Sequence, residues 1–449
     1  MRRDELRRVC SLLAGLAVML GVGSLYAISA WNAQLKELLR YSQAGIGTVS
    51  SLAMLGSYLS YLPGVAFDRL GPHRSIALAG AGLLLVYGLL AAALAYAPER
   101  VSPLLLGLAL VAVGQLSAFC IFASIVPNEG VFGDAHRGKV MAALTSAYSC
   151  GGAVFALVYH RAFDGDVCGY FAFLGALLLA LCAVGWLAFL RSAPTRRRDS
   201  EVVDANAGTA LPDDPAHGKL ASEEEDEDDV TGVALLSDAR FWLLFAAVLV
   251  AVGACLFVMS NVAFIVESLG GPMEQVPLMV ASFAMSNTLA RLATGVASDR
   301  LVARARLPRA AFAALSVLLT ALTLAAFLVV PARALLVPVT MAGVAEGVMF
   351  GTFPVIIREA FGLRHFGKNY GLISVANCIG YPFVFSPMSS FFYERAASAR
   401  GGDDGAKCFG PECFRPVFLV AIALCGVAFA CCVTLMRVRA HRRRYRALS

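Results

Sequence analysis

The sequence predicts an all-α membrane protein with twelve transmembrane helices arranged as two six-helix pseudo-repeats. The chain has 449 residues, of which 59% are hydrophobic and 15% charged, whereas a soluble protein carries roughly 25% charged residues. The hydrophobic residues form long blocks, which indicate membrane spans rather than a soluble core. A G-x-x-x-D-R motif also occurs twice, with Asp68 and Asp299 231 residues apart, as expected of a duplicated bundle.

The hydrophobic blocks set the expected order of the spans. The first block, Val9 to Ser29, is too long for a signal peptide and lacks a small-residue cleavage site, so we expect it to be retained. We place the twelve spans at about 9–30, 45–67, 75–97, 102–127, 139–160, 169–190, 239–266, 276–297, 310–331, 334–357, 370–391 and 415–436.

The basic residues orient these spans. With the N-terminus in the cytoplasm, 27 of the 37 Lys and Arg residues fall on the cytoplasmic side and 9 on the other side, while Arg291 lies inside a span. Basic residues are enriched in cytoplasmic loops, so we expect both termini to be cytoplasmic. The expected location is the plasma membrane or a membrane of vacuolar or lysosomal type.

The segment between the sixth and seventh spans separates two domains. Residues 191–239 contain the acidic run Glu223 to Asp229 and few large hydrophobic residues, so they cannot bury enough surface to offset their ordering entropy. We expect a disordered acidic cytoplasmic linker there. It would join an N-terminal half, 1–190, to a C-terminal half, 240–449, that ends in a basic cytoplasmic tail.

The duplicated motif follows the second span of each half. An acid at the membrane boundary is only partly desolvated, so it stays ionised and can hold a partner. We therefore expect a gating role for the two copies, which comprise Gly64, Asp68 and Arg69 in the first half and Gly295, Asp299 and Arg300 in the second half. The loops His136-Arg137-Gly138-Lys139 and His365-Phe366-Gly367-Lys368 form a further repeated pair.

These motifs resemble the major facilitator superfamily. Within it, Leu25–Ser29, Tyr41–Gln43, Leu62–Gly64 and Phe361–Gly371 are similar to the nodulin-like branch, which is related to the monocarboxylate and oxalate/formate carriers. The resemblance implies two six-helix domains around a central cavity that opens alternately to each side of the membrane.

The monocarboxylate carriers resemble this chain at Arg291–Gly295, where their arginine binds the substrate carboxylate. They place an aspartate one turn earlier and a lysine after a Tyr-Ala-x-x pattern in the first span. This chain has Asn287 and Ala30 at those positions. The aspartate and the lysine that those carriers use for proton coupling are therefore replaced here, whereas the arginine that binds the anion is retained.

Two charged residues inside spans are candidates for binding chemistry. Arg291 could hold a carboxylate or phosphate through its planar guanidinium, or it could pair with Asp299, eight residues later. Glu346 could bind a cation, a metal or a proton, or it could bond to a neighbouring helix through a Ser, an Asn or Arg291. Its counterpart in the first half, 231 residues earlier, is Gln115.

Polar residues in the spans predict a hydrogen-bonding cavity, although any one of them could instead bond neighbouring helices. The candidate substrate-binding residues are Arg291, Glu346, Tyr26, Gln115, Asn287, Asn377, Tyr148 and Asn261. Asn32 belongs to the same polar group.

The twelve cysteines show no zinc-binding spacing, so we expect no metal site. Cys408 and Cys413 lie in the longest outside loop and could form a disulfide. Cys168 is an alternative partner, and free thiols are the other alternative.

The sequence favours a transporter that moves a small-molecule solute through a lipid bilayer by alternating access, and we expect it to function as a monomer. A receptor or sensor that binds solute without moving it is the alternative. The chain lacks a Ser-His-Asp set, HExxH and a phosphate loop, so we expect no enzyme and no cofactor. Its arginine clusters lack interleaved aromatic residues, so we expect no nucleic-acid partner.

Overall fold

The computed structural model describes residues 3–41, 43–132, 136–190, 230–305, 307–398 and 408–446. In these ranges every regular element is a helix, and eleven helices are long and apolar enough to cross a membrane. One of them, Gly45–Tyr96, has 52 residues, about twice the number that a bilayer requires. It holds two of the predicted spans, so the described chain agrees with the twelve-span prediction.

This long run is divided by two breaks. The first lies at Leu59 and Ser60, between α3 (Gln43–Tyr58) and α4 (Tyr61–Tyr96). The second lies inside α4 at Gly71, where φ is 73°, a value that glycine adopts without strain. Pro72 follows and cannot continue the hydrogen-bonding ladder. The chain therefore turns at Gly71, between the second and third spans.

The N-terminal half begins with α1 (Arg3–Val22), the 3₁₀ turn η1 (Gly23–Ala27) and α2 (Ile28–Leu39), which together form the first span and its extension. This helical run continues well past the predicted end at residue 30. After α3 and α4 follow α5 (Pro103–Phe132), α6 (Arg137–Val158), the π-helical η4 (Tyr159–Phe163) and α7 (Val167–Leu190).

The C-terminal half repeats the plan with α11 (Ala239–Ser260), α12 (Val262–Ser268), α13 (Val276–Ala305), α14 (Ala310–Val329) and α15 (Leu336–Phe361). The eleventh span of the chain combines α16 (Phe366–Ile379), the π-helical η7 (Gly380–Phe385) and α17 (Ser386–Ser398). The twelfth and last span is α18 (Arg415–Arg446). Short 3₁₀ turns connect the spans at Pro98–Arg100, Met273–Gln275, Ala332–Ala334 and Pro411–Cys413.

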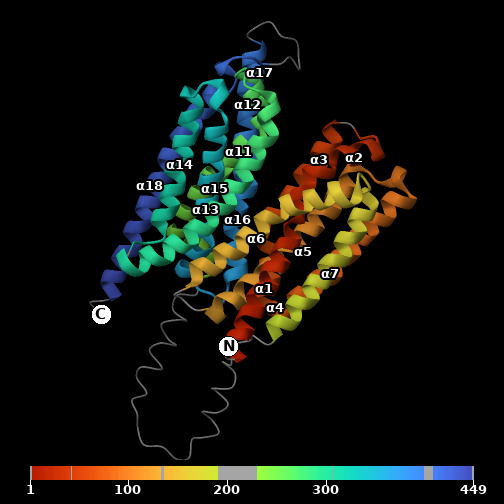
Figure 1. Cartoon of the computed structure of the whole chain (residues 1–449). Coiled ribbons are helices and arrows are strands. Elements are labelled where there is room, and N and C mark those ends of the chain that lie inside the picture. The colour runs from red at the N-terminus through yellow and green to blue at the C-terminus, as the bar shows by residue number, and fades with distance from the viewer. Residues whose placement is uncertain are drawn as a thin grey trace, which may run out of the picture.

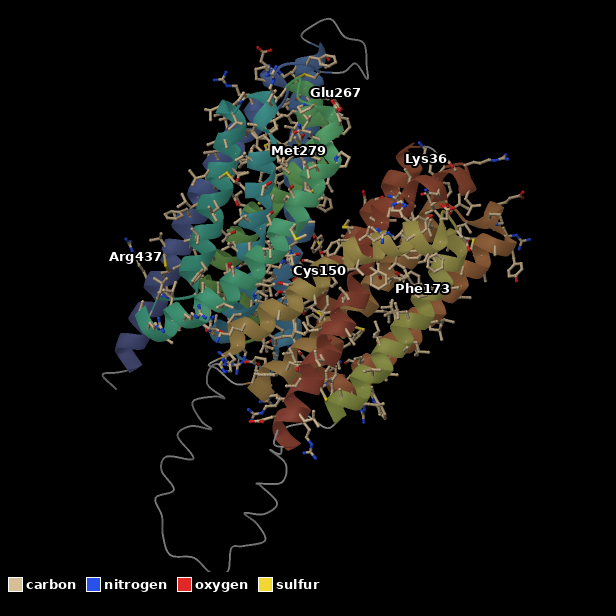
Figure 2. The ribbon with its side chains drawn as sticks, in the orientation of Figure 1. Lys36, Cys150, Phe173, Glu267, Met279 and Arg437 are labelled. Atoms are coloured by element: carbon tan, nitrogen blue, oxygen red, sulfur yellow. A yellow bond between two sulfur atoms is a disulfide. The ribbon has the colours of Figure 1, made fainter. Side chains whose placement is uncertain are left out.

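The two halves form separate bundles that meet mainly along two helix pairs. α6 packs against α13, and α4 packs against α16, while α6 also contacts α15 and α3 also contacts α16. Both ends of the described chain lie on one side of the molecule, which we call the terminal face, and the halves diverge toward the opposite face (Figure 1). Lys36 and Glu267 lie toward that opposite face, whereas Arg437 lies toward the terminal face (Figure 2).

The structure differs from the predicted disordered linker, 191–239, at the end of that segment. A short helix, α10 (Val233–Ser237), precedes α11, and Leu235 within it is fully buried. The carbonyl of Val230 accepts a hydrogen bond from the Asn369 side chain at 2.8 Å. Burial of Leu235 is favourable and can offset the conformational entropy that this end of the linker loses when it becomes ordered. The preceding part of the linker and the last three residues of the basic tail lie outside the described ranges.

Candidate functional site

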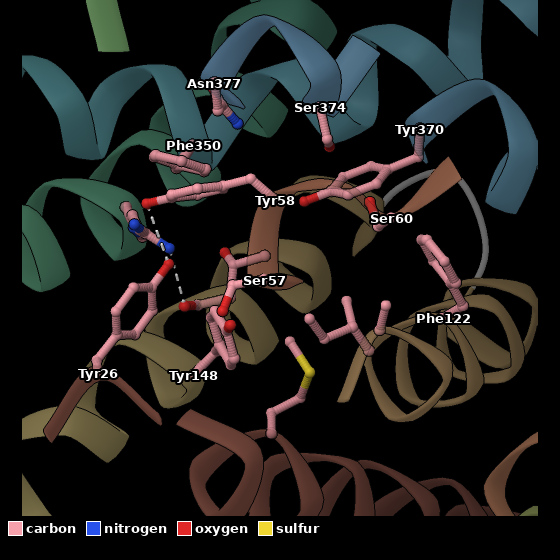
Figure 3. A pocket seen from close by; sticks show the side chains of 15 residues that line it. Tyr26, Ser57, Tyr58, Ser60, Phe122, Tyr148, Phe350, Tyr370, Ser374 and Asn377 are labelled. Carbon is pink, nitrogen blue, oxygen red and sulfur yellow. Dashed lines mark hydrogen bonds between the residues drawn. The ribbon is translucent and has the colours of Figure 1, made fainter. Parts of the chain in front are cut away.

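A pocket lies between the two halves and is lined by both of them (Figure 3). Its lining comprises Met19, Tyr26, Ser57, Tyr58, Ser60, Ala118, Ile121, Phe122, Thr145 and Tyr148 from the N-terminal half and Arg291, Phe350, Tyr370, Ser374 and Asn377 from the C-terminal half. Six of these side chains are aromatic, and Arg291 is the charged one. The pocket is therefore suited to a small solute with an apolar body and a negative charge.

Arg291 on α13 is held in a fixed position. Its Nε donates to Asn287 Oδ1 at 2.7 Å, and its Nη1 donates to the carbonyl of Thr145, in the other half, at 3.1 Å. The guanidinium carbon lies 4.3 Å from the centre of the Phe350 ring, a cation–π distance. Partners among the described residues take two of the five guanidinium donors. The other donors are available to a ligand in the pocket.

Glu346 on α15 lies behind this arginine rather than in the pocket lining. Its Oε2 accepts a hydrogen bond from Asn287 Nδ2 at 2.8 Å, and the same amide accepts the Arg291 bond through Oδ1. Asn287 thus connects a buried carboxylate to a buried guanidinium. A change in the charge of Glu346 would act on Arg291 through this amide.

Three phenol side chains from the N-terminal half lie at the pocket. The Tyr26 hydroxyl donates to the Tyr58 hydroxyl at 3.4 Å, and the Tyr26 and Tyr148 rings meet edge to face with their centres 5.1 Å apart. Tyr26 lies in η1, and Tyr58 ends α3 just before the break at Ser60. Local departures from α-helix therefore place two of these rings.

Half of the eight predicted substrate-binding residues line the pocket, and the other half lie outside its lining. Arg291, Tyr26, Tyr148 and Asn377 line the pocket, whereas Glu346, Asn287, Gln115 and Asn261 do not. The Gln115 amide donates to the carbonyls of Gly56 and Leu59, at 2.8 and 2.7 Å, which the break after α3 leaves without helical partners. Asn261 donates to Phe257 of its own helix. Roles in substrate binding remain a prediction for all eight residues.

Eleven of the fifteen pocket-lining residues were not predicted from sequence as binding residues, and four of them show why. Tyr58 and Phe350 sit in apolar runs, where an aromatic residue is usually part of the core. Tyr370 and Ser374 could have been found, because with Asn377 they follow an i, i+4, i+7 pattern along one face of α16.

At the terminal face, the first copy of the motif reaches across to the other half. Asp68 accepts the backbone N–H groups of Gly367 and Lys368, at 3.1 and 2.9 Å. These are the second and third residues of α16, whose N-cap, His365, provides no side-chain cap. A carboxylate from one half therefore caps a helix of the other half, which the charge distribution of the helix favours. We call this the first gate contact.

The second copy makes the reciprocal contact. Asp299 accepts the N–H groups of Gly138 and Lys139, at 3.0 and 2.9 Å. These are again the second and third residues of a helix, α6, whose N-cap, His136, makes no side-chain cap. The repeated His-x-Gly-Lys loops thus receive the two aspartates. We call this the second gate contact.

The motif glycines allow the two halves to touch. A Cβ atom at Gly64 would collide with the backbone of Gly367, and one at Gly295 would collide with Ala142 and the backbone of Gly138. Both glycines therefore lie where helices of opposite halves pack backbone to backbone.

The arginine partners at these contacts differ from the expectation. Arg69 and Arg300 of the motif are exposed. Asp299 is instead paired with Arg309 at 2.8 Å, so the alternative in which Arg291 pairs with Asp299 is wrong. Since residues eight apart on a helix are about 12 Å apart along its axis, Arg291 faces the pocket and Asp299 faces the gate.

Further ion pairs at the terminal face were missed from sequence. Arg309 also binds Glu359 at 2.6 Å, and Glu129 pairs with Arg137 at 2.7 Å and with Arg358 at 3.2 Å. The pair between Glu129 and Arg358 joins the two halves. Arg309 is paired across 50 residues with Glu359, and Glu129 is paired with Arg358 in the other half, so charge alone could not identify these two pairs.

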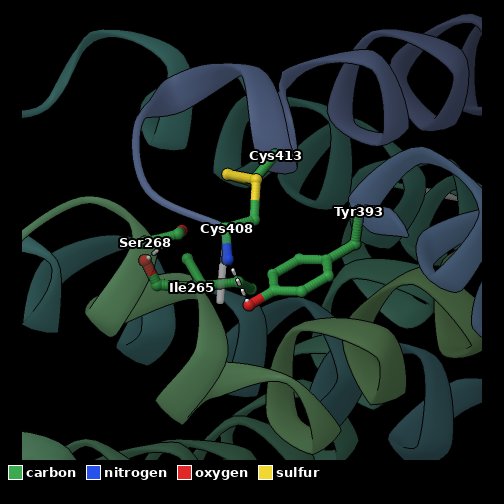
Figure 4. Close-up of a disulfide and its surroundings, with 5 residues drawn as sticks. All are labelled: Ile265, Ser268, Tyr393, Cys408 and Cys413. Atoms are coloured by element: carbon green, nitrogen blue, oxygen red, sulfur yellow. Dashed lines mark hydrogen bonds between the residues drawn. A yellow bond between two sulfur atoms is a disulfide. The ribbon is translucent and has the colours of Figure 1, made fainter. Parts of the chain in front are cut away.

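At the opposite face, Cys408 and Cys413 form a disulfide, and Cys168, the alternative partner, is a free thiol (Figure 4). The loop is held further by the Cys408 N–H, which donates to the Tyr393 hydroxyl at 2.9 Å, and by the Gly410 N–H, which donates to the Ser268 carbonyl at 2.7 Å. The disulfide therefore belongs to a loop that is bonded to α12 and α17.

Solved structures with the same fold are membrane transporters of low sequence identity. A proton:xylose symporter bound to 6-bromo-6-deoxy-D-glucose aligns with a TM-score of 0.64 and 14% identity over 95% of each chain. A bacterial homologue of the iron transporter ferroportin, in an outward-facing state with soaked iron, aligns with a TM-score of 0.63 and 13% identity over 97% of this chain and 99% of its own. At these identities the likeness concerns the fold.

Sequence relatives extend over nearly the whole chain. A probable transporter mch1 from Emericella nidulans is 24% identical and covers 92% of this chain and 83% of its own length. One from Neurospora crassa is 23% identical, with 94% and 87% covered. The family model of the Major Facilitator Superfamily matches residues 11–385. The chain therefore belongs to the Major Facilitator Superfamily.

Proposed function

We propose that this protein transports a small organic anion across its membrane by alternating access, and that Arg291 binds the anionic group. The observation that carries the proposal is a buried guanidinium, 5% exposed, that lines a pocket between the two halves with donors to spare. A cation inside the membrane is costly unless it is paired. Glu346 reaches the guanidinium only through Asn287, so a bound carboxylate would supply a countercharge in direct contact and could take two parallel hydrogen bonds.

The gate contacts support an alternating mechanism. Both lie at the terminal face, and each joins one half to the other. Release of these four hydrogen bonds and of the ion pair between Glu129 and Arg358 would free the halves to separate there, so that the pocket opens to the terminal face. We assign that face to the cytoplasm, from the excess of Lys and Arg in its segments.

The named relatives support transport over the receptor alternative. The fungal relatives are probable transporters, and the solved structures with this fold include a proton:xylose symporter and a homologue of an iron transporter. Xylose and iron are unlike cargoes, so the substrate class rests on the pocket of this chain. Membership of the nodulin-like branch is part of the proposal and rests on the sequence stretches quoted above.

We also propose that transport is coupled to a proton carried by Glu346. Asn287 and Ala30 replace the titratable groups of the carriers that the chain resembles. Glu346 is a buried carboxylate, 4% exposed, joined to Arg291 through Asn287. Protonation of Glu346 would remove a negative charge near the guanidinium and strengthen its hold on the substrate anion.

Uptake into proteoliposomes tests the transport proposal. A panel of radiolabelled monocarboxylates is offered to the purified parent, to Arg291→Ala and to Arg300→Gln, whose side chain is exposed at the terminal face. We expect saturable uptake of at least one anion, loss of that uptake in Arg291→Ala and parent-like uptake in Arg300→Gln. Binding without uptake would favour a receptor, and uptake that survives Arg291→Ala would contradict the assigned binding group.

Thiol labelling tests the orientation. With a single cysteine at Ser222, an impermeant reagent added to intact cells should not react, whereas it should react after permeabilisation. Labelling from outside would place this segment, and with it the gate contacts, on the non-cytoplasmic side.

A further inference from the structure

Lys36 and Glu267 carry opposite charges at equivalent positions of the two halves. Glu267 follows Lys36 by 231 residues, the interval that also separates Asp68 from Asp299. Lys36 lies in the last turn of α2, and Glu267 is the second-last residue of α12. Both helices extend the first span of their half toward the opposite face, and both side chains are half-buried. The duplicated position therefore holds a base in one half and an acid in the other.

Each of these two extensions is set off from its span by a break in the α-helix. The 3₁₀ turn η1 separates α1 from α2, and Asn261 separates α11 from α12. A departure from regular α-helix within a span often marks a place where the helix can bend. Tyr26, which lines the pocket, lies in the first of these breaks. The breaks therefore give the extensions a way to move relative to the rest of their halves, and one of them does so beside the pocket.

The two halves diverge at the face where these extensions end. Lys36 and Glu267 lie toward that face (Figure 2), and α12 lies on the edge of the C-terminal half that faces the N-terminal half (Figure 1). The halves of this fold are related by an axis along the membrane normal. A residue near such a two-fold axis meets its own counterpart when the halves close, because the rotation exchanges the two positions. Closure at this face would therefore bring Lys36 toward Glu267.

The charges of the two residues favour a contact across the axis over a role within each helix. The C-terminal end of a helix carries partial negative charge, which favours Lys36 at the end of α2 but disfavours Glu267 at the same end of α12. The acid is therefore not explained by stabilisation of its own helix. The same charge at both positions would repel on closure. A base facing an acid attracts instead, and the attraction grows as water leaves the closing surface.

We propose that Lys36 and Glu267 form an ion pair that locks the protein when its halves close at the opposite face. This inference rests on the proposed alternating access. Any partner that either side chain holds in the present state is exchanged for the other side chain on closure. The ion pair and the two gate contacts then hold the protein in alternate states, the pair when the pocket is open to the terminal face and the gate contacts when it is closed there.

Cysteine cross-linking of the purified full-length protein tests whether the two positions meet. The variant Lys36→Cys/Glu267→Cys is treated with a short bismaleimide, and mass spectrometry of the digest identifies the linked peptides. We expect a link between positions 36 and 267 that forms several-fold faster when Asp68→Asn is added, because that change weakens the first gate contact. The control Lys36→Cys/Arg333→Cys, whose second site lies in an exposed connecting turn, should not link. Absence of the link between 36 and 267 in both backgrounds would overturn the proposal.

Charge reversal tests the ion pair itself, through the exchange of radiolabelled monocarboxylates across proteoliposome membranes. Lys36→Glu and Glu267→Lys each place like charges at the closing surface, so exchange should fall about tenfold. The double variant restores opposite charges and should return to within about twofold of the parent. Glu99→Lys and Arg333→Glu reverse charges in exposed turns of the same face and should leave exchange unchanged. A double variant no faster than the slower single variant would contradict the pairing.

The outcomes separate this inference from the proposed function. If the parent exchanges no monocarboxylate, the anion proposal is wrong, whereas the cross-link and its response to Asp68→Asn still decide whether Lys36 and Glu267 meet on closure. If a charge reversal prevents folding, as judged by unfolding temperature, the neutral variants Lys36→Gln and Glu267→Gln take its place, and each should slow exchange several-fold. Parent-like exchange in both neutral variants would show that no ion pair locks this face.

Discussion

Asp68 and Asp299 occupy equivalent places in the two halves, and each accepts two backbone N–H groups at the start of a helix in the opposite half. Their surroundings differ. Asp299 is 8% exposed and pairs with the buried Arg309, which also binds Glu359, whereas Asp68 is half-buried. The duplicated motif thus keeps the same backbone contact at two degrees of burial, and the more deeply buried second contact should be the more costly one to break.

Gln115 and Glu346 extend this comparison to the middle of the halves. Gln115 stabilises a helix break within its own half through two backbone carbonyls. Glu346 instead bonds to Asn287 beside Arg291. Both halves therefore give the pocket phenols and hydroxyls, whereas its charged residue comes from the C-terminal half. The comparison teaches that the two halves share one helical arrangement but differ in the charge they bring to the pocket.

The largest expected effect concerns Glu346. Glu346→Gln keeps the shape and can still accept from Asn287, but it carries no titratable proton. We expect accumulation driven by an imposed pH gradient to be lost, while substrate exchange across the membrane continues because it needs no net proton movement. Proteoliposome uptake with and without the gradient measures this. Unchanged pH dependence would exclude Glu346 as the proton carrier, and Gln115→Glu, the mirror change, should not create a dependence.

The next effect concerns the second gate contact. Asp299→Asn leaves Arg309 buried with one carboxylate partner fewer, and loss of one member of a buried pair costs about 3–5 kcal/mol. We expect a clear fall in unfolding temperature in detergent and slower transport, with membrane insertion retained. Arg309→Gln should give a similar fall. A variant as stable and active as the parent would show that this contact does not hold the halves together.

Asp68→Asn should have a smaller effect. It replaces a carboxylate that accepts two N–H bonds with a neutral amide whose single oxygen can still accept one of them. The loss is therefore that of one bond to a charged group, about 1.5–3 kcal/mol. We expect slower transport and a shift toward opening at the terminal face, without the marked instability of Asp299→Asn. If Asp68→Asn proves the more damaging of the two, the ranking by burial is wrong.

The smallest effect is expected at the motif arginines. Arg69→Gln and Arg300→Gln change exposed side chains, and such changes usually alter stability by no more than about 0.5 kcal/mol. Both variants should transport at close to the parent rate. A large loss in either would mean that the arginines act in a state other than the one described.

The sequence by itself determined the all-helical membrane fold, the duplication and the aspartates that join the halves. These features can be read from local sequence. A block of apolar residues long enough to cross the bilayer must form a helix, because its backbone groups find no other partners in lipid. A motif repeated at a constant spacing shows the duplication. The sequence also identified Arg291, Tyr26, Tyr148 and Asn377, which line the pocket, since polar and charged residues stand out against an apolar run.

The tertiary structure alone decided which of these residues meet. Arg309 rather than Arg291 pairs with Asp299, and Gln115 satisfies a helix break instead of entering the pocket. Tyr58 reaches the pocket from the end of α3. Such pairings depend on the packing of helices that are distant in sequence, and on breaks that free backbone carbonyls. The residue types are visible in the sequence, but their partners are set by the fold.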